Sequence, residues 1–292
     1  MRVFITGGSG FIGRHLAGHF GLRHTVCAPS RSELNLLDGD AVREFLSANW
    51  FDVVVHSATV RSNRKMPAPA ALFQQNCRMF FNLARNNGLY GKVIYFGSGA
   101  EYDSRHYQPK MREEYFDTHV PADDYGFSKY VCAKSLAATP NIYELRLFAV
   151  FGPYEDWQVR FLSNACCRAV WDLPIVIRQN VVFDFLDVAD VARVVEWFAV
   201  NTPRQQHFNV CSGRALDLKT LAAMVVTASG KQLDILVKRE GLGAEYSGDN
   251  TRLLAEMGDF AFRGMDVSIK ELYRWYEDRK ANVDPTMLHF DA

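Results

Sequence analysis

The strongest constraint on the fold is a glycine-rich loop that lies between a strand pattern and a helix pattern at the start of the chain. Residues 2–6 (RVFIT) predict the strand, residues 6–13 are TGGSGFIG, and apolar spacing over about residues 11–20 predicts the helix. Glycines allow a tight turn and a close approach of the backbone to a pyrophosphate, which lies at the helix N-terminus in dinucleotide-binding units. The predicted loop contacts to a dinucleotide are Gly7, Gly10, Phe11, Ile12 and Gly13.

Strand and helix patterns alternate over the first half of the chain. Strands are predicted at residues 24–28, 51–56, 92–96 and 142–148, and helices at about 39–48, 69–87 and 123–138. Continuous apolar strands separated by helices are typical of a parallel sheet that is covered on both faces. We therefore predict an α/β protein of the Rossmann type, with a doubly wound parallel sheet.

The pattern changes after Gly152 and Pro153, where the predicted elements become shorter and their linkers less regular. This change predicts a second, smaller C-terminal α/β part that binds substrate. The predicted division is residues 1–150 plus about 176–198 for the dinucleotide-binding domain, about 151–175 and 200–280 for the substrate-binding domain, and 281–292 for a weakly patterned tail.

Charge, apolar runs and cysteines exclude several classes of function. Lys plus Arg and Asp plus Glu both number 33, so the chain lacks the basic surplus that general nucleic-acid binders carry. Apolar runs such as residues 52–55 and 174–177 are far shorter than the roughly 20 residues that span a bilayer. The N-terminus does not have the pattern of a signal peptide, and the six cysteines show no metal-ligand spacing. We expect a cytoplasmic protein with no membrane, nucleic-acid or metal partner.

The end of the second predicted strand bears on the choice between NAD and NADP. An acidic residue about 20 positions beyond the glycine loop binds the adenine ribose of NAD, and the sequence Cys27-Ala28-Pro29-Ser30-Arg31 has none. Ser30 and Arg31 fit a 2′-phosphate instead, because a guanidinium binds phosphate by bidentate contact. The pattern favours NADP. It leaves NAD open, with Arg31 as an ordinary surface arginine.

A tyrosine and a lysine lie four residues apart on the helix predicted at 123–138. Tyr125 and Lys129 therefore share one helix face, where the lysine cation would stabilise the tyrosinate that proton transfer leaves behind. Ser98 follows the strand predicted at 92–96, at the sheet edge where ligands bind outside the carboxyl ends of parallel strands. With the glycine loop, these three residues predict the catalytic group of an oxidoreductase.

These motifs together resemble the extended short-chain dehydrogenase/reductase family, the NAD-dependent epimerase/dehydratase group, over nearly the whole chain. The resemblance implies that Ser98 orients the substrate oxygen, Tyr125 is the acid/base, and Lys129 binds the nicotinamide ribose. It also implies a homodimer that pairs through the helices near 69–87 and 123–138. Further family matches imply cofactor contacts at Asn35, Leu36, Ser57, Ala58, Thr59 and Asn76.

Residues 31–38 (RSELNLLD) resemble the subgroup of GDP-fucose synthases and related nucleotide 4-keto-sugar reductases, where the corresponding arginine lies at the NADP 2′-phosphate. Departures from the family narrow the reaction. Gly99 and Ala100 follow Ser98 where dehydratases carry Asp-Glu, so 4,6-dehydration is not expected. Ala100 and Arg160 stand where the fucose synthases use Cys and His to epimerise C3 and C5, and neither is a suitable acid/base. The predicted substrate contacts are Ser98, Gly99, Ala100, Arg160 and Arg252.

Three functional hypotheses follow. The first is NADP-dependent reduction of the C4 carbonyl of a nucleotide-activated keto sugar, of the deoxy type. The second is a nucleotide-sugar 4-epimerase with tightly bound NAD, which would use the same residues to oxidise and then reduce. The third is a non-catalytic dinucleotide-binding regulator, against which the intact catalytic residues argue. A small basic cluster is interpreted either as a solvated loop or as a contact to ligand phosphates: Arg61, Arg64 and Lys65.

Overall fold

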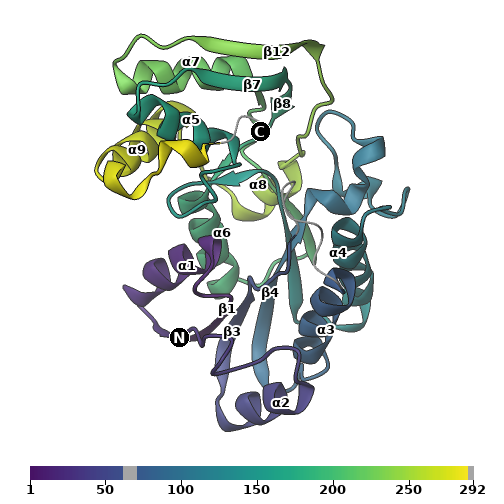
Figure 1. Ribbon diagram of the computed structural model, residues 1–292. Helices are drawn as coiled ribbons and strands as arrows, with labels where there is room; N and C mark the ends of the chain where they lie inside the picture. Colours follow the sequence, from purple (N-terminus) through teal and green to yellow (C-terminus); the bar gives the residue numbers. More distant parts are fainter. Residues whose placement is uncertain (62–70, 289–292) are drawn as a thin grey trace.

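The computed structural model of the protein describes residues 1–61 and 71–288 (Figure 1). A large parallel sheet with helices on both faces carries a smaller helical part, which lies at the top of Figure 1. No helix of the described residues is both long and apolar enough to cross a membrane. The same residues contain no group of three or more His, Cys, Asp or Glu side chains that could hold a metal ion.

The large sheet has six strands, all parallel, in the order β10-β5-β4-β3-β1-β2. Its strands are β1 (Arg2–Thr6), β2 (Thr25–Cys27), β3 (Phe51–His56), β4 (Tyr90–Ser98), β5 (Ile142–Leu147) and β10 (His207–Val210). Every residue of β5 is buried, as a strand covered on both faces requires. The strand order reverses between β1 and β3, and ligands bind at such a switch point beside the carboxyl ends of the strands.

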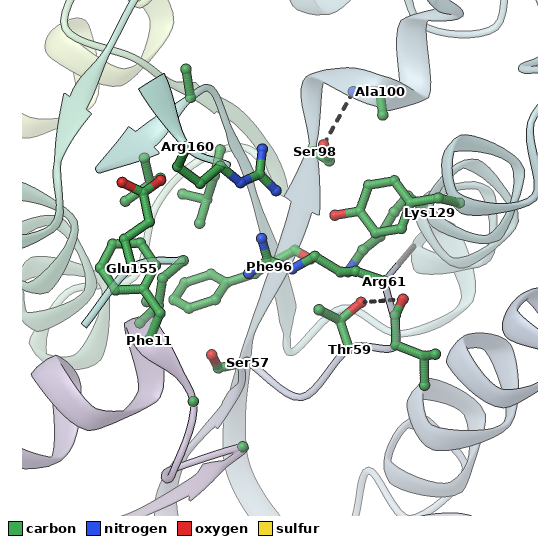
Figure 2. A pocket seen from close by; sticks show the side chains of 18 of the residues that line it. Phe11, Ser57, Thr59, Arg61, Phe96, Ser98, Ala100, Lys129, Glu155 and Arg160 are labelled. Carbon is green, nitrogen blue, oxygen red and sulfur yellow. Dashed lines mark hydrogen bonds between the residues drawn. The ribbon is translucent and has the colours of Figure 1, made fainter. Parts of the chain in front are cut away.

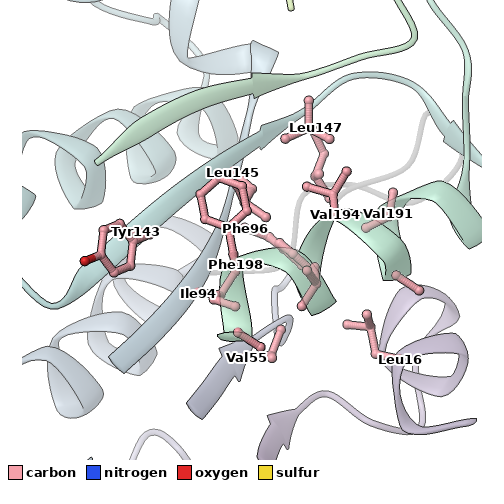
Figure 3. Packing of buried hydrophobic residues seen from close by; sticks show 14 of the residues in the cluster. Leu16, Val55, Ile94, Phe96, Tyr143, Leu145, Leu147, Val191, Val194 and Phe198 are labelled. Atoms are coloured by element: carbon pink, nitrogen blue, oxygen red, sulfur yellow. The ribbon is translucent and has the colours of Figure 1, made fainter. Parts of the chain in front are cut away.

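Helices cover both faces of this sheet, as the sequence predicts. On one face lie α1 (Phe11–Gly21) and α6 (Val188–Val200), whose apolar side chains pack on the strands (Figure 3). On the other face lie α2 (Gly39–Ala48), α3 (Leu72–Ala84) and α4 (Asp124–Lys134). The alternation of the strands separates the two cores, since Val3 and Ile5 of β1 face one cluster and Phe4 faces the other.

The smaller part packs three helices beside a parallel strand pair. The helices are α5 (Phe161–Val170), α7 (Leu218–Ser229) and α9 (Met265–Glu277), and the strands are β7 (Ile175–Asn180) and β12 (Ile235–Leu242). All of α5 is buried, so this helix is the centre of the second core. Short elements join the two parts: β6 (Val150–Phe151) with β9 (Leu186–Asp187), β8 (Val182–Phe183) with β11 (Leu216–Asp217), and α8 (Thr251–Met257).

The strand pairing of the structure differs from the predicted domain boundaries at two places. Residues 207–210 were expected in the smaller part, but they form β10 and hydrogen-bond to β5 at the edge of the large sheet. Residues 176–180 were expected to return to the large part, but they belong to β7, which pairs with β12. Only α6 returns from that segment, because its apolar face covers the large sheet. Both strands are short, and a short strand pattern does not say which sheet edge the strand joins.

The tail predicted over 281–292 is packed as far as it is described. Val283 and Leu288 are buried in the core of the smaller part, and Arg168 donates a hydrogen bond to the Leu288 carbonyl oxygen at 3.2 Å. Two isolated apolar anchors produce no periodic pattern, which is why the sequence suggested a loose tail. Residues 289–292 lie outside the described residues.

The core of the large part gives a direct stability prediction. Phe198 of α6 is fully buried against the sheet, whereas Val200 on the same helix is 62% exposed. We expect Phe198→Ala to lower the free energy of unfolding by about 3–5 kcal/mol, because it leaves a cavity, and Val200→Ala to change it by less than about 0.5 kcal/mol. Urea unfolding of both variants measures this. Equal effects would contradict the placement of α6.

Candidate active site

A large cavity, of about 1170 Å³, lies between the two parts. Its walls come from the glycine loop, from the carboxyl ends of β3 and β4, from the start of α4, and from β7 and β12 of the smaller part. In Figure 2, Ser98, Ala100 and Lys129 lie on one side of this cavity, and Glu155 and Arg160 lie on the opposite side. This is the place where the sequence predicts both the dinucleotide and the catalytic group.

The glycine loop has the shape that the sequence predicts. Gly7 has a φ of +68°, which favours glycine, and a Cβ there would come within 2.9 Å of the Ala58 backbone. The Gly10 N–H donates to the Gly7 carbonyl at 2.9 Å, and α1 starts at Phe11 without a side-chain cap. The cradle therefore leaves N–H groups of the first helical turn available to an anion. Gly13 is buried behind the loop and does not line the cavity, unlike Gly7, Gly10, Phe11 and Ile12.

The hydroxyl of Thr6 ties this loop to the next strand end. Its oxygen accepts hydrogen bonds from the backbone N–H groups of Ser57 and Ala58, both at 3.1 Å. Its own proton is donated to Nδ1 of buried His56 at 2.8 Å. Burial, and secondarily the charge of Lys129, lowers the pKa of His56 to about 3, so the ring is neutral and can accept this proton. The bonding fixes Ser57, Ala58 and Thr59 along the cavity wall.

Asn76 lies on the predicted helix, and its side chain bonds to the backbone of the protein itself. It is buried in α3 and does not line the cavity. Its side-chain oxygen accepts from the Val60 N–H at 2.7 Å, and its amide donates to the Val60 carbonyl at 3.0 Å. Asn76 therefore holds the loop that begins at Ser57, and the cofactor contact expected of it stays a prediction.

At the other end of the glycine loop, Ser30, Arg31, Asn35 and Leu36 all line the cavity. Arg31 is exposed and has no carboxylate partner among the described residues. Ser30 is already engaged, because its N–H and its hydroxyl donate to the Glu33 carboxylate at 2.7 and 2.8 Å. These bonds lower the pKa of Glu33. The sequence reasoning missed Glu33, which lies two positions beyond the segment 27–31 in which an acid was sought.

The three predicted catalytic residues converge on the cavity. Lys129 is 5% exposed, donates to the Phe96 carbonyl at 2.7 Å, and lies 5.9 Å from the centre of the Tyr125 ring. Ser98 ends β4, which pairs with β3 and β5 at the middle of the sheet. A serine hydroxyl, a tyrosine hydroxyl and a lysine cation therefore face one space, which suits proton transfer to an oxygen of a bound substrate.

Ser98 is held on both sides by hydrogen bonds. Its N–H donates to the Glu101 carboxylate at 2.8 Å, and its hydroxyl oxygen accepts from the Ala100 N–H at 3.2 Å. This reciprocal cap starts the short helix of residues 99–102. Ala100 lines the cavity and Gly99 does not, since Gly99 packs against Phe148, whose ring a Cβ would meet at 2.7 Å.

Arginines line the end of the cavity that the smaller part forms. Arg160, Arg178 and Arg239 lie there, and Arg61 reaches the cavity from the loop after β3 of the large part (Figure 2). None of the four forms an ion pair with an acidic side chain of the described residues. Sequence reasoning missed Arg178 and Arg239, because only the pairing of β7 with β12 brings them together. Of the basic cluster considered above, Arg64 and Lys65 lie outside the described residues.

Arg252 does not join this group. It does not line the cavity, and its guanidinium donates to Glu114 at 2.6 Å and lies 3.8 Å from Glu113. In this structure the charge of Arg252 is balanced by two carboxylates of the segment at 113–115, and the substrate contact expected of it stays a prediction.

A buried carboxyl group in the cavity wall was also missed. Glu155 is 8% exposed and accepts a hydrogen bond from the Ser163 hydroxyl at 2.8 Å. Burial raises the pKa of Glu155 to about 7, although the charges of Arg160 and Arg61 act in the opposite direction. One acidic residue in an irregular segment shows no sequence pattern that predicts burial. Only the packing of the structure shows that Glu155 is buried in the cavity wall.

Known proteins are similar to this chain in sequence or share its fold. The chain is 27% identical over 255 residues to the GDP-6-deoxy-D-mannose reductase of Pseudomonas aeruginosa, which covers 80% of this chain and 82% of the relative. A GDP-L-fucose synthetase from Naegleria fowleri bound to NADP superposes with a TM-score of 0.82 at 16% identity, covering 97% and 94% of the two chains. The UDP-glucose 4-epimerase of Thermotoga maritima with UDP-glucose gives 0.80 at 20% identity, covering 97% and 100%.

At 16% and 20% identity, the two superpositions show that the fold is shared and nothing more. The family assignment rests on the sequence, in which residues 3–211 match the NAD dependent epimerase/dehydratase family. The matched range includes the glycine loop, Ser98, Tyr125 and Lys129. Because that match covers well over half of the chain, the protein belongs to the NAD dependent epimerase/dehydratase family.

Proposed function

We propose that the protein reduces the C4 carbonyl of a nucleotide-activated keto sugar, of the deoxy type, with NADPH. One observation carries this proposal: a single cavity joins Arg31 and the glycine loop, the Ser98–Tyr125–Lys129 group, and the unpaired arginines of the smaller part. A dinucleotide and a second anionic ligand can therefore lie end to end, with their reacting ends beside the catalytic group.

The large part would hold the cofactor. The loop glycines form a cradle that any Cβ at Gly7 would fill, which fits a pyrophosphate at the start of α1. Arg31 would bind the 2′-phosphate, and Lys129 the nicotinamide ribose. The other proposed cofactor contacts are Gly10, Phe11, Ile12, Ser30, Asn35, Leu36, Ser57, Ala58, Thr59 and Tyr125, all of which line the cavity.

Bound NADPH supplies the hydride, and the chain supplies the proton and the orientation. The Ser98 hydroxyl donates a hydrogen bond to the carbonyl oxygen of the substrate, and Tyr125 gives that oxygen its phenolic proton. Lys129, which the Phe96 carbonyl holds in place, stabilises the tyrosinate that remains. Ala100 offers no acid/base group beside Ser98, so the residues here support the hydride step and not the loss of water.

The smaller part would hold the nucleotide diphosphate of the substrate. Arg178 of β7, Arg239 of β12 and Arg160, which precedes α5, all reach the cavity. Guanidinium groups bind phosphate oxygens by paired hydrogen bonds, and these groups have no acidic partner among the described residues to displace. The likeness to a GDP-6-deoxy-D-mannose reductase and to an NADP-bound GDP-L-fucose synthetase supports this choice of substrate class.

A second candidate is a nucleotide-sugar 4-epimerase that retains NAD, and one observation favours it. Glu33 stands at Ser30, and a carboxylate at the end of the second strand suits the free hydroxyls of an unphosphorylated ribose. The fold of UDP-glucose 4-epimerase is also similar. The same three catalytic residues would then act twice, first on a hydroxyl and then on a carbonyl.

We also propose that two copies pair through α3 and α4. Phe73 of α3 stacks on Phe127 of α4 with ring centres 5.0 Å apart, and Phe81 of α3 is 39% exposed. The two helices thus present a shared aromatic surface that a second copy could cover.

Cofactor choice is tested on the purified protein, first by identifying any dinucleotide that denaturation releases. We expect an empty protein that binds NADPH more tightly than NADH. Arg31→Ala should weaken NADPH binding roughly 10- to 100-fold, since a charged hydrogen bond contributes about 1.5–3 kcal/mol, and leave NADH binding unchanged. Titration by nicotinamide fluorescence measures both. Stoichiometric NAD that survives purification would replace the reductase with the epimerase.

Catalysis is tested with 4-keto-6-deoxy sugars linked to GDP, UDP, dTDP or ADP, by following NADPH oxidation. Tyr125→Phe should lower kcat about 100- to 10,000-fold through the loss of the general acid, while NADPH still binds. Tyr130→Phe is the matched control, because Tyr130 lies on the same helix and bonds to Asp117 outside the cavity. Full biological effect in a Tyr125→Phe strain would support the non-catalytic regulator.

The arginines of the smaller part are tested by substitution on one strand. We expect Arg239→Ala to raise KM about tenfold or more with kcat nearly unchanged, because it removes a charged contact that is equal in ground and transition states. Arg178→Ala should behave alike. Lys238→Ala is the control, since Lys238 precedes Arg239 on β12 and does not line the cavity. A similar effect of all three would indicate general charge attraction instead.

A further inference from the structure

Two completely buried glutamates lie directly beneath Ser98. Glu101 belongs to the short helix of residues 99–102, and Glu144 lies in the middle of β5. Both contact the guanidinium of Arg146, which is itself 1% exposed: its Nε donates to Glu101 at 2.7 Å, and Nη2 lies 2.9 Å from Glu144. One cation thus faces two acids in a place without solvent.

One carboxylate oxygen of this cluster has no hydrogen-bond partner. Oε1 of Glu101 accepts the Ser98 N–H, and Oε2 of Glu144 is 2.8 Å from Nδ1 of His207. Oε1 of Glu144 is buried and has no hydrogen-bond partner. A buried carboxylate oxygen without a partner is costly, so the cluster needs one more donor than its nitrogen atoms supply.

The position of that oxygen identifies the missing donor. A Cβ placed on Gly97 would lie 2.6 Å from Oε1 of Glu101 and 2.7 Å from Oε1 of Glu144. The two carboxyl groups therefore meet at the same point of the β4 backbone, where only a glycine leaves room. A proton held between them gives the unpartnered oxygen its hydrogen bond and removes one of two like charges.

The surrounding charges agree with one shared proton. Burial, and then the charge of Glu144, raises the pKa of Glu101 to about 8, although Arg146 opposes this. For Glu144, burial acts upward, but Arg146 and His207 bring its pKa below the usual value. His207 is 30% exposed. Lys129 of α4, the Ser98 N–H and the hydroxyl of Tyr102, which accepts from Arg146, also face the pair. The hydroxyls of Tyr95, Tyr107 and Tyr246 lie close enough to Glu101 to interact with its charge.

We propose that Glu101 and Glu144 share one proton at neutral pH, and that this pair is a positioning device which holds Ser98 through its backbone N–H. The importance of Ser98 for turnover rests on the proposed function, whereas the shared proton does not. Glu101 and Glu144 are positioning residues, because neither lines the cavity.

The Ser98 amide reports on the pair directly, since it donates to Glu101. In the full chain labelled with 15N-serine, we expect the Ser98 amide resonance to shift with a midpoint near pH 8, as the shared proton leaves. Glu144→Gln places a permanent amide donor where the proton lies, so the fold is retained and this titration disappears. Glu155→Gln is the matched control, because it removes a buried carboxyl of the cavity wall and leaves the pair intact.

The pH dependence of the free energy of unfolding gives a second test, which needs no assignment of NMR resonances. Between the usual glutamate pKa and about 8, the folded chain would hold a proton that the unfolded chain has lost, so stability falls as pH rises in that window. One such proton raises the unfolding equilibrium constant tenfold per pH unit. We expect Glu144→Gln to lower the pH slope of the wild-type protein by that amount, and Glu101→Gln to be the more damaging variant, because one of its two acceptor oxygens becomes a donor.

A wild-type Ser98 amide that does not titrate, with the same pH slope of stability in wild type and Glu144→Gln, would overturn the proposal, because both carboxyls would then be ionised. If Glu144→Gln fails to fold, the wild-type titration alone decides. Failure of the turnover assays with a positive amide titration would refute the proposed function and leave the shared proton standing.

Discussion

The hydroxyl of Thr6 is the contact on which the site depends. It binds two backbone N–H groups after β3 and donates to neutral His56, so it joins the carboxyl ends of β1 and β3 at the switch point of the sheet. The glycine loop and the Ser57 loop can then approach so closely that Gly7 has no room for a side chain. A charged histidine could not accept this bond, which is why its burial matters to the geometry of the cavity.

The sequence predicted what depends on local pattern. The strand–loop–helix at residue 2, the Tyr125–Lys129 pair and the strand-end Ser98 all lie where expected, because periodicity and helix spacing determine them. It could not predict contacts that depend on how distant segments pair. Arg178 and Arg239 reach the cavity only through the pairing of β7 with β12. Arg252 forms ion pairs with Glu113 and Glu114, which lie far from it in the sequence.

Charge is distributed unevenly between the cavity and the interior. Toward the cavity, Arg160, Arg178 and Arg239 have no acidic partner among the described residues. Behind Ser98 the balance is reversed, with two buried acids around Arg146. Unpaired cations suit a surface that receives an anion, whereas an excess of buried acid must be neutralised by protons. Ser98 thus lies between a cavity whose cations suit an anionic ligand and an interior whose acids need a proton.

The edge strand β10 of the large sheet is formed by residues that lie late in the chain. Residues 207–210 close the free edge of β5 after the chain has passed through α5, β7 and α6. During synthesis, one backbone edge of β5 therefore stays unpaired until residue 210 has emerged. Truncation before that point would expose a template for intermolecular pairing, so the smaller part cannot be removed as a simple C-terminal piece.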